Sequence, residues 1–322
     1  MRVSQRLASP QVLLAPMAGV TDAAYRLICR AHGADLAYTE MVSVAGIHYR
    51  SDKTWELVYP HDDEPEIAVQ LFGSEPAQFE EAAAKVVERV GEKLALIDIN
   101  MACPVPKVVR KGEGSALMDD PARAAGIVRA TRAGAGDGVD VTVKIRRGRT
   151  VGNEVAPAFA QVMEDAGAAA IAVHGRFASD YYRGSSDFGC VERVAEAVSI
   201  PVIASGDMLT APRIAEVLQT SKVSAVMVAR GSYGNPWIFE DAKRLLEGGS
   251  APKHDALERL DALEEHIRLI VATGAHLAFA RRLVGWYVKG LHAASALRNA
   301  GMECSSLDDY LDLIQTARAH LS

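Results

Sequence analysis

Residues 201–231, PVIASGDMLTAPRIAEVLQTSKVSAVMVARG, contain two short apolar runs, PVIASG and AVMVAR, on either side of a helical segment. Both runs are apolar throughout rather than alternating, which is typical of strands that are buried on both faces of a parallel sheet. Residues 211–219, between the two runs, have the length and pattern of a helix. The stretch therefore predicts a strand–helix–strand unit with parallel strands.

The same rhythm recurs along the preceding part of the chain. Asp22 is placed to cap the helix after the first run, and Ser74 to cap the helix over residues 76–90. Eight strand–helix units predict a (βα)8 TIM barrel, an α/β fold, although the rhythm alone also permits an open doubly wound sheet. The six further apolar runs begin near Val12, Leu36, Ile67, Leu94, Val141 and Ile171.

The composition changes after the eighth unit. Residues 248–252, GGSAP, are typical of a linker, and from His254 onward the pattern is only helical. A chain of 322 residues fits a barrel of roughly 250 residues with a small addition. We therefore predict a catalytic barrel over residues 1–247, a linker over 248–253 and an all-α C-terminal domain over 254–322.

The bulk composition argues against several classes of protein. A net charge of −6 and a pI of about 5.9 disfavour a protein that coats nucleic acid, so any such contact has to be local. The four cysteines form no CxxC pair, and neither HxH nor HExxH occurs, which disfavours disulfides and metal sites. No apolar run reaches the ~18 residues of a membrane span. We expect a cytoplasmic protein with no membrane partner and no metal.

Polar residues gather at the predicted C-terminal ends of the strands, where TIM barrels place their active sites. A Lys or Gln inside an apolar run is costly to bury unless it has a partner. The pattern therefore predicts a polar ligand in the barrel mouth. The polar residues at the strand ends are Glu40, Gln70, Asn100, Lys144, His174, Ser205, Asp207 and Arg230. The same strand ends also carry Pro16, Met17, Ala18, Gly206 and Ala229.

Several of these residues suggest a flavin phosphate as the ligand. Gly206 and Gly231 follow the last two strands, where barrels often bind phosphate through backbone N–H groups, and Arg230 adds a charged fork. Lys144 suits a delocalised anion such as the N1–C2 region of a reduced flavin, or is a core lysine paired with a carboxylate. Gln70 suits a flavin ring edge, or is an ordinary residue of a polar layer.

Cys103 lies three residues after Asn100, in the segment INMACPVPKVVRKGEGSAL. Its place on a loop at the active-site face favours a functional thiol over an inert one. His174, at a strand end beside Arg176, is expected to contact a ligand. The other cysteines, at positions 29, 190 and 304, fall on predicted helices or at their ends, and we interpret them as structural.

Taken in order, these motifs resemble those of bacterial tRNA-dihydrouridine synthases, and most of all the B-type, nitrogen-regulation-3-like branch. The resemblance covers nearly the whole chain, including VGWYVKGL in the tail. The motifs that carry it are APMAGVTD, VQLFG, DINMACP, KGEGSALM, VKIR, HGR, IASGD and ARGSYGNPWIF.

The resemblance implies an enzyme that binds FMN and uses NADPH to reduce C5=C6 of uridines in tRNA. It implies that Cys103 is the proton donor, and that Asn100 and Arg176 face the base. FMN would be bound by Pro16, Met17, Ala18, Gln70, Lys144, His174, Ser205, Gly206, Asp207, Ala229 and Arg230.

Four positions depart from the family pattern. Ala102 and Ala229 stand where the family usually has Gly, Ser205 where it has Asn, and Leu283 where it commonly has His. Because Gly tolerates conformations that Ala resists, the two alanines are expected to crowd the backbone or to alter a turn.

The expected chemistry is the addition of a hydride from reduced FMN to C6, followed by protonation of C5 by Cys103. An ordinary thiol has a pKa of about 8.5 and is mostly protonated at neutral pH, so it can act as a general acid. The nearest alternative is an FMN-dependent barrel that acts on a free pyrimidine, such as dihydroorotate or dihydropyrimidine. Further alternatives are a Schiff-base lyase that uses Lys144 and a non-catalytic RNA-binding barrel.

A uridine within folded tRNA has to be turned out of its stack, so cationic groups around the mouth are expected to hold the RNA backbone. Arg282, Trp286 and Lys289 are predicted to share one helix face in the tail, and Lys107 lies on the cysteine loop. The full set of candidates is Lys107, Arg110, Lys111, Arg146, Arg147, Arg149, Arg281, Arg282 and Lys289.

Overall fold

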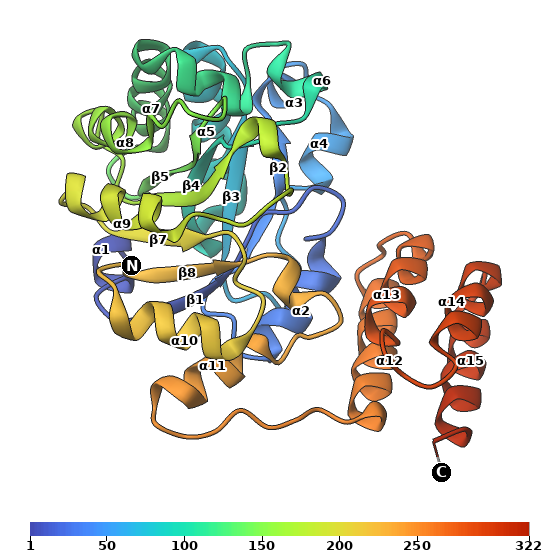
Figure 1. Ribbon diagram of the computed structural model, residues 1–322. Helices are drawn as coiled ribbons and strands as arrows, with labels where there is room; N and C mark the ends of the chain where they lie inside the picture. Colours follow the sequence, from blue (N-terminus) through green and yellow to red (C-terminus); the bar gives the residue numbers. More distant parts are fainter. Residues whose placement is uncertain (322) are drawn as a thin grey trace.

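The computed structural model describes residues 1–321 and contains eight parallel strands that curl into a barrel (Figure 1). A single bridge between Leu14 and Ala37, in which the Leu14 N–H donates to the Leu36 carbonyl at 2.9 Å, joins the two edges of the sheet. The predicted TIM-barrel fold is confirmed. The strands are β1 (Gln11–Leu14), β2 (Tyr38–Ser43), β3 (Ile67–Phe72), β4 (Leu94–Met101), β5 (Val141–Gly148), β6 (Ile171–Phe177), β7 (Val202–Ser205) and β8 (Ala225–Val228).

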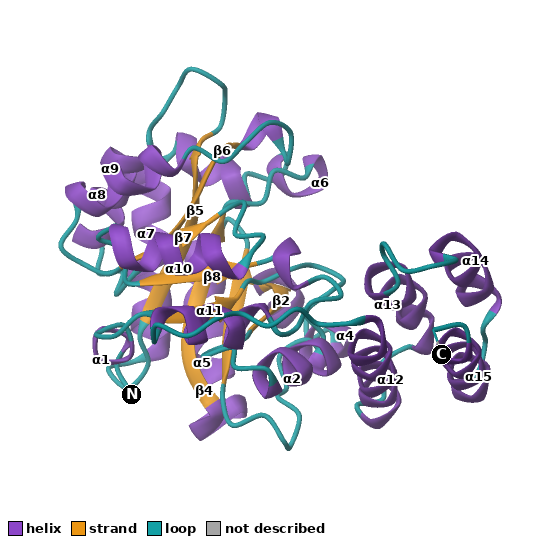
Figure 2. Cartoon of the chain, turned by 60° about the horizontal axis from the view of Figure 1, so that its bottom comes forward, coloured by secondary structure: helices purple, strands orange, loops and turns teal. Residues whose placement is uncertain are grey.

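Helices alternate with the strands and cover the outside of the barrel (Figure 2). The helices as far as β8 are α1 (Val3–Arg6), α2 (Ala23–Ala31), α3 (Val44–His48), α4 (Asp52–Glu56), α5 (Pro76–Val90), α6 (Pro106–Val109), α7 (Pro121–Ala135), α8 (Ala156–Asp165), α9 (Phe188–Ala197) and α10 (Ala211–Thr220). Those after β8 are α11 (Ile238–Leu246), α12 (Ala256–Ala272), α13 (Ala280–Tyr287), α14 (Ala294–Glu303) and α15 (Leu307–Ala319). Short 3-10 turns are η1 (Gly91–Lys93), η2 (Gly114–Asp119), η3 (Ala178–Asp180), η4 (Arg230–Ser232) and η5 (Leu277–Phe279).

One of the two predicted helix caps is wrong. Asp22 caps α2 as expected, because its carboxylate accepts from the Tyr25 N–H at 2.9 Å. Ser74 does not cap α5, whose N-cap is Glu75 and makes no side-chain hydrogen bond. Pro76 occupies the first turn of α5, and its ring fixes a helical φ without an N–H that needs a cap.

Two apolar layers hold the barrel together. Ile99 and Val143 belong to the outer layer, between the sheet and the helices. Leu13, Leu96 and Met227 belong to the inner layer, which fills the barrel. Val3 and Leu7, in and just after α1, pack against the inner layer. The open end of the barrel is therefore the one at which the strands finish.

The four helices α12 to α15 form a separate cluster beside the barrel, next to α2 (Figure 1). Leu263, Val284 and Ile314 lie in its core, and Ala24 and Trp237 of the barrel pack into the same cluster. The predicted linker, residues 248–253, lies between α11 and α12. Ser322, the last residue of the predicted C-terminal domain, lies outside the described residues.

Candidate active site at the barrel mouth

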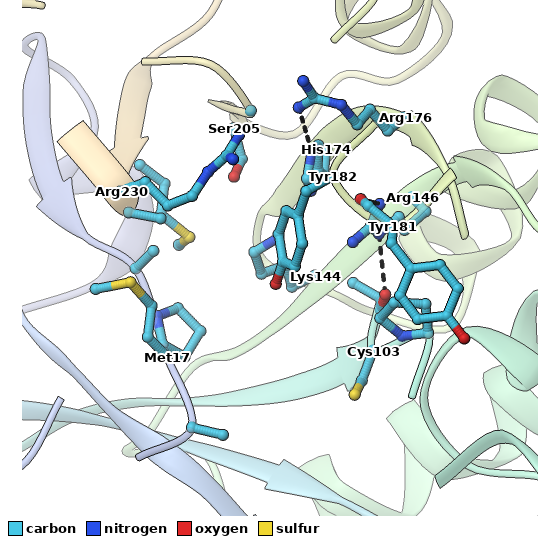
Figure 3. Close-up of a pocket in the computed structure, with 18 of the residues that line it drawn as sticks. Met17, Cys103, Lys144, Arg146, His174, Arg176, Tyr181, Tyr182, Ser205 and Arg230 are labelled. Atoms are coloured by element: carbon cyan, nitrogen blue, oxygen red, sulfur yellow. Dashed lines mark hydrogen bonds between the residues drawn. The ribbon is translucent and has the colours of Figure 1, made fainter. Parts of the chain in front are cut away.

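A cavity of about 500 Å³ opens at the C-terminal ends of the strands (Figure 3). Met17 and Arg230 lie on one side of it and Cys103 on the other, with Lys144 and His174 between them (Figure 3). The predicted residues that line the cavity are Pro16, Met17, Ala18, Asn100, Cys103, Lys144, His174, Arg176, Ser205, Gly206, Asp207, Ala229 and Arg230.

The loop that carries Cys103 is held from two directions. From below, the Asn100 side-chain oxygen accepts from the backbone N–H groups of Ala102 and Cys103, at 3.1 and 2.9 Å. From behind, the Ser115 N–H donates to the Cys103 carbonyl at 3.0 Å. Gly114 has a φ of +60°, and a Cβ there would lie 2.8 Å from that carbonyl oxygen. The KGEGSAL motif thus supplies the close backbone contact against which the cysteine loop rests.

The surroundings of Cys103 favour the neutral thiol. Burial raises the pKa of Cys103, while a hydrogen bond from the Val105 backbone and the positive charge of Arg146 partly oppose that rise. A raised pKa suits a group that gives up a proton in catalysis and is the opposite of what a nucleophilic thiolate needs. At neutral pH Cys103 therefore holds the proton that a general acid would deliver.

Lys144 is the principal cation of the cavity floor. Its side chain extends from β5, and the residue is only 8% exposed. Burial, followed by repulsion from Arg146, lowers the pKa of Lys144 to about 8, while the nearby Asp98 opposes that shift. Such a lysine is charged at neutral pH and gains from a nearby anion, because the anion replaces part of the lost hydration.

Gln70 lies beneath the cavity and does not line it. It is fully buried, its side-chain N–H donates to Asp98 at 2.6 Å, and its side-chain oxygen accepts from Asn100 at 2.8 Å. Of the two interpretations left open by the sequence, this placement favours the polar layer. The predicted contact between Gln70 and a flavin edge has no counterpart in the cavity lining.

His174 is neutral, and its tautomer follows from its neighbour. Burial, with the positive charges of Arg146 and Lys144, places the pKa of His174 well below its usual value. The Arg176 guanidinium lies 3.3 Å from His174 Nε2, a contact drawn as a dashed line in Figure 3. Because Arg only donates, Nε2 has to accept, and the ring proton therefore resides on Nδ1.

Asp207 links two arginines at the end of the cavity formed by β7 and β8. Its carboxylate accepts from Arg176 at 2.7 Å, from Arg230 at 3.1 Å and from the Ser186 N–H at 2.8 Å. Burial raises the pKa of Asp207, but the Ser186 N–H and Arg176 together hold it below the usual value. The carboxylate is therefore ionised and positions the two guanidinium groups.

The backbone beside these arginines approaches other groups closely enough to require glycine. Gly206 has a φ of +100°, and a Cβ there would lie 2.6 Å from His174 Cδ2. A Cβ on Gly231 would collide with the Met208 carbonyl. Gly206 and the Arg176–Asp207–Arg230 group thus form a cationic cradle in the cavity wall, which has the chemistry of a phosphate site. Gly231 follows Arg230 but does not line the cavity.

Arg146 has a role that the sequence did not reveal. It was predicted to contact an RNA backbone, but it is 2% exposed and donates to the carbonyls of Ala102 at 3.1 Å and Tyr181 at 2.8 Å. The prediction of an exposed contact is wrong, because the side chain folds inward and ties the cysteine loop to the loop after β6. Its neighbours Arg147 and Arg149 are held in ion pairs with Glu154 and Asp119.

Tyr182 is a cavity residue that sequence reasoning missed. It lines the cavity, yet it is 58% exposed, and Arg146 and Arg230 lie 5.8 and 5.1 Å from its ring centroid. Tyr181, beside it, has a φ of +54°, which is rare for a residue with a side chain. The two adjacent tyrosines after the HGR motif were the sequence feature that could have indicated this residue. Because they lie in an irregular loop, no periodicity predicts which way their side chains point.

The departures from the family pattern are accommodated locally. Neither Ala102 nor Ala229 is among the residues with a positive φ, so neither position needs the left-handed backbone that favours glycine. Ala229 has a φ of −113° and a ψ of −102°, which lies outside the helical and extended regions. Ala102 lines the cavity, and its N–H donates to Asn100 while its carbonyl accepts from Arg146. Leu283 is buried in the apolar cluster of the tail, so this position contributes packing and not a surface contact. The expectation that the two alanines crowd the backbone or alter a turn stays a prediction.

The cations of the tail do not share one helix face. Arg282 lies on α13, above the rings of Phe279 and Trp286 and against Gly19 of the loop after β1. Helix α13 ends at Tyr287, so Lys289 falls beyond it and lines a shallow groove with Trp286 and Leu209. The predicted face is wrong because the helix stops too early. Lys107 is exposed on α6, outside the cavity.

A comparison with known protein families decides the assignment. A family profile described as Dihydrouridine synthase (Dus) matches residues 13–321. The chain belongs to the dihydrouridine synthase family. The tRNA-dihydrouridine synthase B of Xanthomonas campestris pv. campestris is 38% identical over 301 residues, covering 92% of this chain and 89% of that protein. The protein of the same name from Shewanella oneidensis is 38% identical over 282 residues, covering 86% of each chain.

Solved structures of other families share only the fold with this member of the dihydrouridine synthase family. Histamine dehydrogenase from Rhizobium sp. 4-9 superposes with a TM-score of 0.55 at 13% identity, covering 80% of this chain and 49% of that one. A variant of NCR from Zymomonas mobilis superposes with a TM-score of 0.52 at 16% identity, covering 77% of this chain and 90% of that one.

Among residues 1–321, none of the helices is long and apolar enough to cross a membrane. The same residues contain no group of three or more His, Cys, Asp or Glu side chains that could hold a metal ion.

Proposed function

We propose that this member of the dihydrouridine synthase family reduces uridines in tRNA to 5,6-dihydrouridine, with FMN as its flavin and NADPH as its reductant. The observation that carries the proposal is the position of Cys103, on a tightly held loop in the same cavity as Lys144 and a cationic cradle, where burial raises the pKa of its thiol. The names of the relatives with 38% identity support tRNA as the substrate.

The cavity residues fit FMN. The cradle formed by Gly206, Arg176 and Arg230 would hold the phosphate, with Ser205 and Ala229 beside it. Asp207 would act indirectly, because it orients both arginines. Pro16, Met17 and Ala18 give an apolar wall for a planar ring, and Lys144 and the Nδ1–H of neutral His174 would face its polar edge. Bound FMN would supply the hydride that adds to C6 of the uracil ring.

Cys103 would complete the reduction as the general acid. Once a hydride is at C6, negative charge is spread over C5 and O4 of the base, and the Cys103 thiol would give its proton to C5. The raised pKa of Cys103 keeps that proton available at neutral pH. Proton transfer from a positioned side chain typically contributes ~10²–10⁴-fold to a rate.

The remaining groups would recognise the base. Asn100 lines the cavity and accepts from the Cys103 N–H. Arg176 is buried beside His174 and serves both the cradle and the cavity wall. The exposed Tyr182, at the rim, offers a ring against which a base that has left its stack could pack.

The cations outside the cavity would hold the rest of the tRNA. Arg282 lies between the tail and the loop after β1, Lys289 lies in the groove between barrel and tail, and Lys107 lies on the opposite rim. We assign catalysis to residues 1–247 and tRNA docking to residues 254–322, with residues 248–253 as the linker. Turning a base out of its stack costs a few kcal/mol, which such contacts would offset.

An absorbance titration tests the proposal. The purified protein is reconstituted with FMN, reduced anaerobically with NADPH, and then mixed with unmodified tRNA. We expect the flavin bands to bleach with NADPH and to return with tRNA, but not with free uridine or orotate. Bands that return only with a free pyrimidine would transfer the assignment to the small-molecule reductases. If the protein does not retain FMN, both the tRNA reductase and the free-pyrimidine reductase assignments are rejected.

A further inference from the structure

A chain of hydrogen bonds runs beneath the cavity floor from Thr142 to the backbone of Cys103. The Thr142 hydroxyl donates to Asp98 Oδ1 at 2.6 Å, and Gln70 Nε2 donates to Asp98 Oδ2 at 2.6 Å. Asn100 Nδ2 then donates to Gln70 Oε1 at 2.8 Å. The chain ends where Asn100 Oδ1 accepts from the Ala102 and Cys103 N–H groups.

Both ends of this chain have a fixed direction. An ionised Asp98 can only accept, so Gln70 must turn its N–H group toward it and its oxygen toward Asn100. The backbone N–H groups of Ala102 and Cys103 can only donate, so Asn100 must turn its oxygen toward them. Two amides that could otherwise flip are therefore each held in one orientation.

We propose that Asp98 is a positioning residue for the reaction: its carboxylate fixes the orientation of Gln70 and, through it, that of Asn100, and so holds the Cys103 loop at the cavity. The inference deepens the proposed function, because it rests on Cys103 being the proton donor. Asp98 itself does not line the cavity and touches neither substrate nor flavin.

The location of Asp98 supports a role beyond packing. It lies on β4 inside the barrel, is 1% exposed, and burial raises the pKa of its carboxyl to about 6. A carboxylate in such a place costs more than an apolar side chain of the same size, which often stabilises a core better. The partners of Asp98 lead directly to the cysteine loop, so the orientation it imposes explains its presence.

The test compares Asp98→Leu, which removes the acceptor, with Asp98→Asn, which retains one. In Asp98→Asn the Thr142 hydroxyl can reverse and accept from the new amide, so the rest of the chain persists. For Asp98→Leu with FMN bound, we expect tRNA-dependent reoxidation to slow by roughly 10²-fold, as for a misplaced catalytic group. Reduction by NADPH and reoxidation by dioxygen should change by less than about twofold, and Asp98→Asn should recover most of the tRNA-dependent rate.

A second readout does not depend on turnover. Cys103 is the partly exposed cysteine, and Cys29, Cys190 and Cys304 are buried, so iodoacetamide reports on the Cys103 loop. We expect Asp98→Leu to raise the alkylation rate of Cys103 on the order of tenfold, because a released loop exposes the thiol, and Asp98→Asn to leave it near wild type. If Asp98→Leu does not fold, Gln70→Met breaks the same chain one bond later and should raise alkylation equally.

Ile97→Ala is the matched control, because Ile97 lies next to Asp98 on β4 but packs in the outer core. Ile97→Ala should lower the midpoint temperature of unfolding, while the rates of tRNA-dependent reoxidation and of Cys103 alkylation stay unchanged. The inference is overturned if Ile97→Ala reproduces the Asp98→Leu pattern, or if folded Asp98→Asn is as impaired as Asp98→Leu. If wild-type flavin is not reoxidised by tRNA, the proposed function fails, while the alkylation comparison still decides whether Asp98 holds the loop.

Discussion

The floor of the cavity and the outer surface of the tail both carry polar groups, but they hold them in opposite ways. On and directly beneath the floor, Asn100, Lys144 and Asp98 are buried, and the amide and carboxylate groups have fixed partners. On the tail, Arg282 and Lys289 are exposed, and Arg282 rests on aromatic rings. A buried group that loses its partner costs far more than an exposed one, so the floor is the region where one substitution disturbs a whole network.

This difference separates chemistry from docking. The floor fixes where the Cys103 loop and Lys144 stand relative to each other, and under the proposed function small displacements there would lower the rate steeply. Exposed cations act through long-range attraction that falls with salt, and their contributions are small and nearly independent. Substitutions in the two regions should therefore differ in size and in kind.

The largest effect is expected at Cys103. Cys103→Ala should retain FMN and its reduction by NADPH, while tRNA-dependent reoxidation falls by ~10²–10⁴-fold because no group remains to protonate C5. Stopped-flow absorbance of the two half-reactions measures this directly. Cys304→Ala, at the end of α14, is the control. Unchanged turnover in Cys103→Ala would remove the thiol from the mechanism.

Lys144 should give the cavity a pH dependence. Its lowered pKa of about 8 means that the positive charge is present below pH 8 and is lost as the pH rises through that value. The affinity for FMN should therefore weaken above about pH 8, and at pH 7 Lys144→Met should lose about ten- to a hundredfold, equivalent to a charged hydrogen bond. Quenching of flavin fluorescence from pH 6.5 to 9.5 measures it.

The control for that experiment is Lys85→Met, which removes a half-buried lysine paired with Glu81 on α5, outside the cavity lining. It should reproduce the wild-type pH profile, whereas the profile of Lys144→Met should be flat across pH 8. A Lys144→Met variant that keeps the wild-type slope would assign the titration to another group.

A smaller effect is expected at the cradle. Arg230→Met should weaken FMN by roughly tenfold, because a charge-assisted hydrogen bond to phosphate is lost, yet should leave riboflavin, which has no phosphate, unaffected. Comparing the two dissociation constants isolates the phosphate contact. Arg213→Met, on the neighbouring α10, should change neither. Equal losses for FMN and riboflavin would mean that Arg230 supports the cavity rather than a phosphate.

The smallest effects are expected on the tail. Arg282→Ala and Lys289→Ala should each weaken tRNA binding by roughly two- to fivefold. Each should also reduce the slope of log K against log salt by about 0.7–0.9, without altering reduction by NADPH. Filter binding at several salt concentrations tests both. Lys222→Ala, just before β8 at the other end of the barrel, should have no effect.

The sequence predicted the barrel and most of the cavity because both follow local rules. Continuous apolar runs mark buried strands, and the end of each strand places its next residues at the mouth, so Lys144, His174 and Arg230 could be assigned without coordinates. The cap at Ser74 failed because Pro76 begins α5 without one. A sequence pattern does not tell which of two adjacent residues, Ser74 or Glu75, becomes the N-cap of this helix.

The other wrong predictions concern side chains whose direction or depth depends on the three-dimensional arrangement of their strand or helix. Arg146 and Arg147 are adjacent on β5, and only the alternation of the strand, read in register with β6, tells which one turns inward. Gln70 lies on an inward position, but its depth in the barrel depends on strand tilt. Lys289 was misplaced because α13 stops at Tyr287, so that Lys289 does not continue the helical spacing.

One contact between tail and barrel links their stability. Tyr233, which lines the cavity, stacks on Trp286 of the tail with centroids 4.1 Å apart. Next to it, Gly234 lies so near the tail backbone that a Cβ would come within 2.5 Å of the Trp286 carbonyl carbon. The cavity wall and the tail therefore share one interface, and a graft of a foreign tail would have to bring its own aromatic partner to leave the cavity intact.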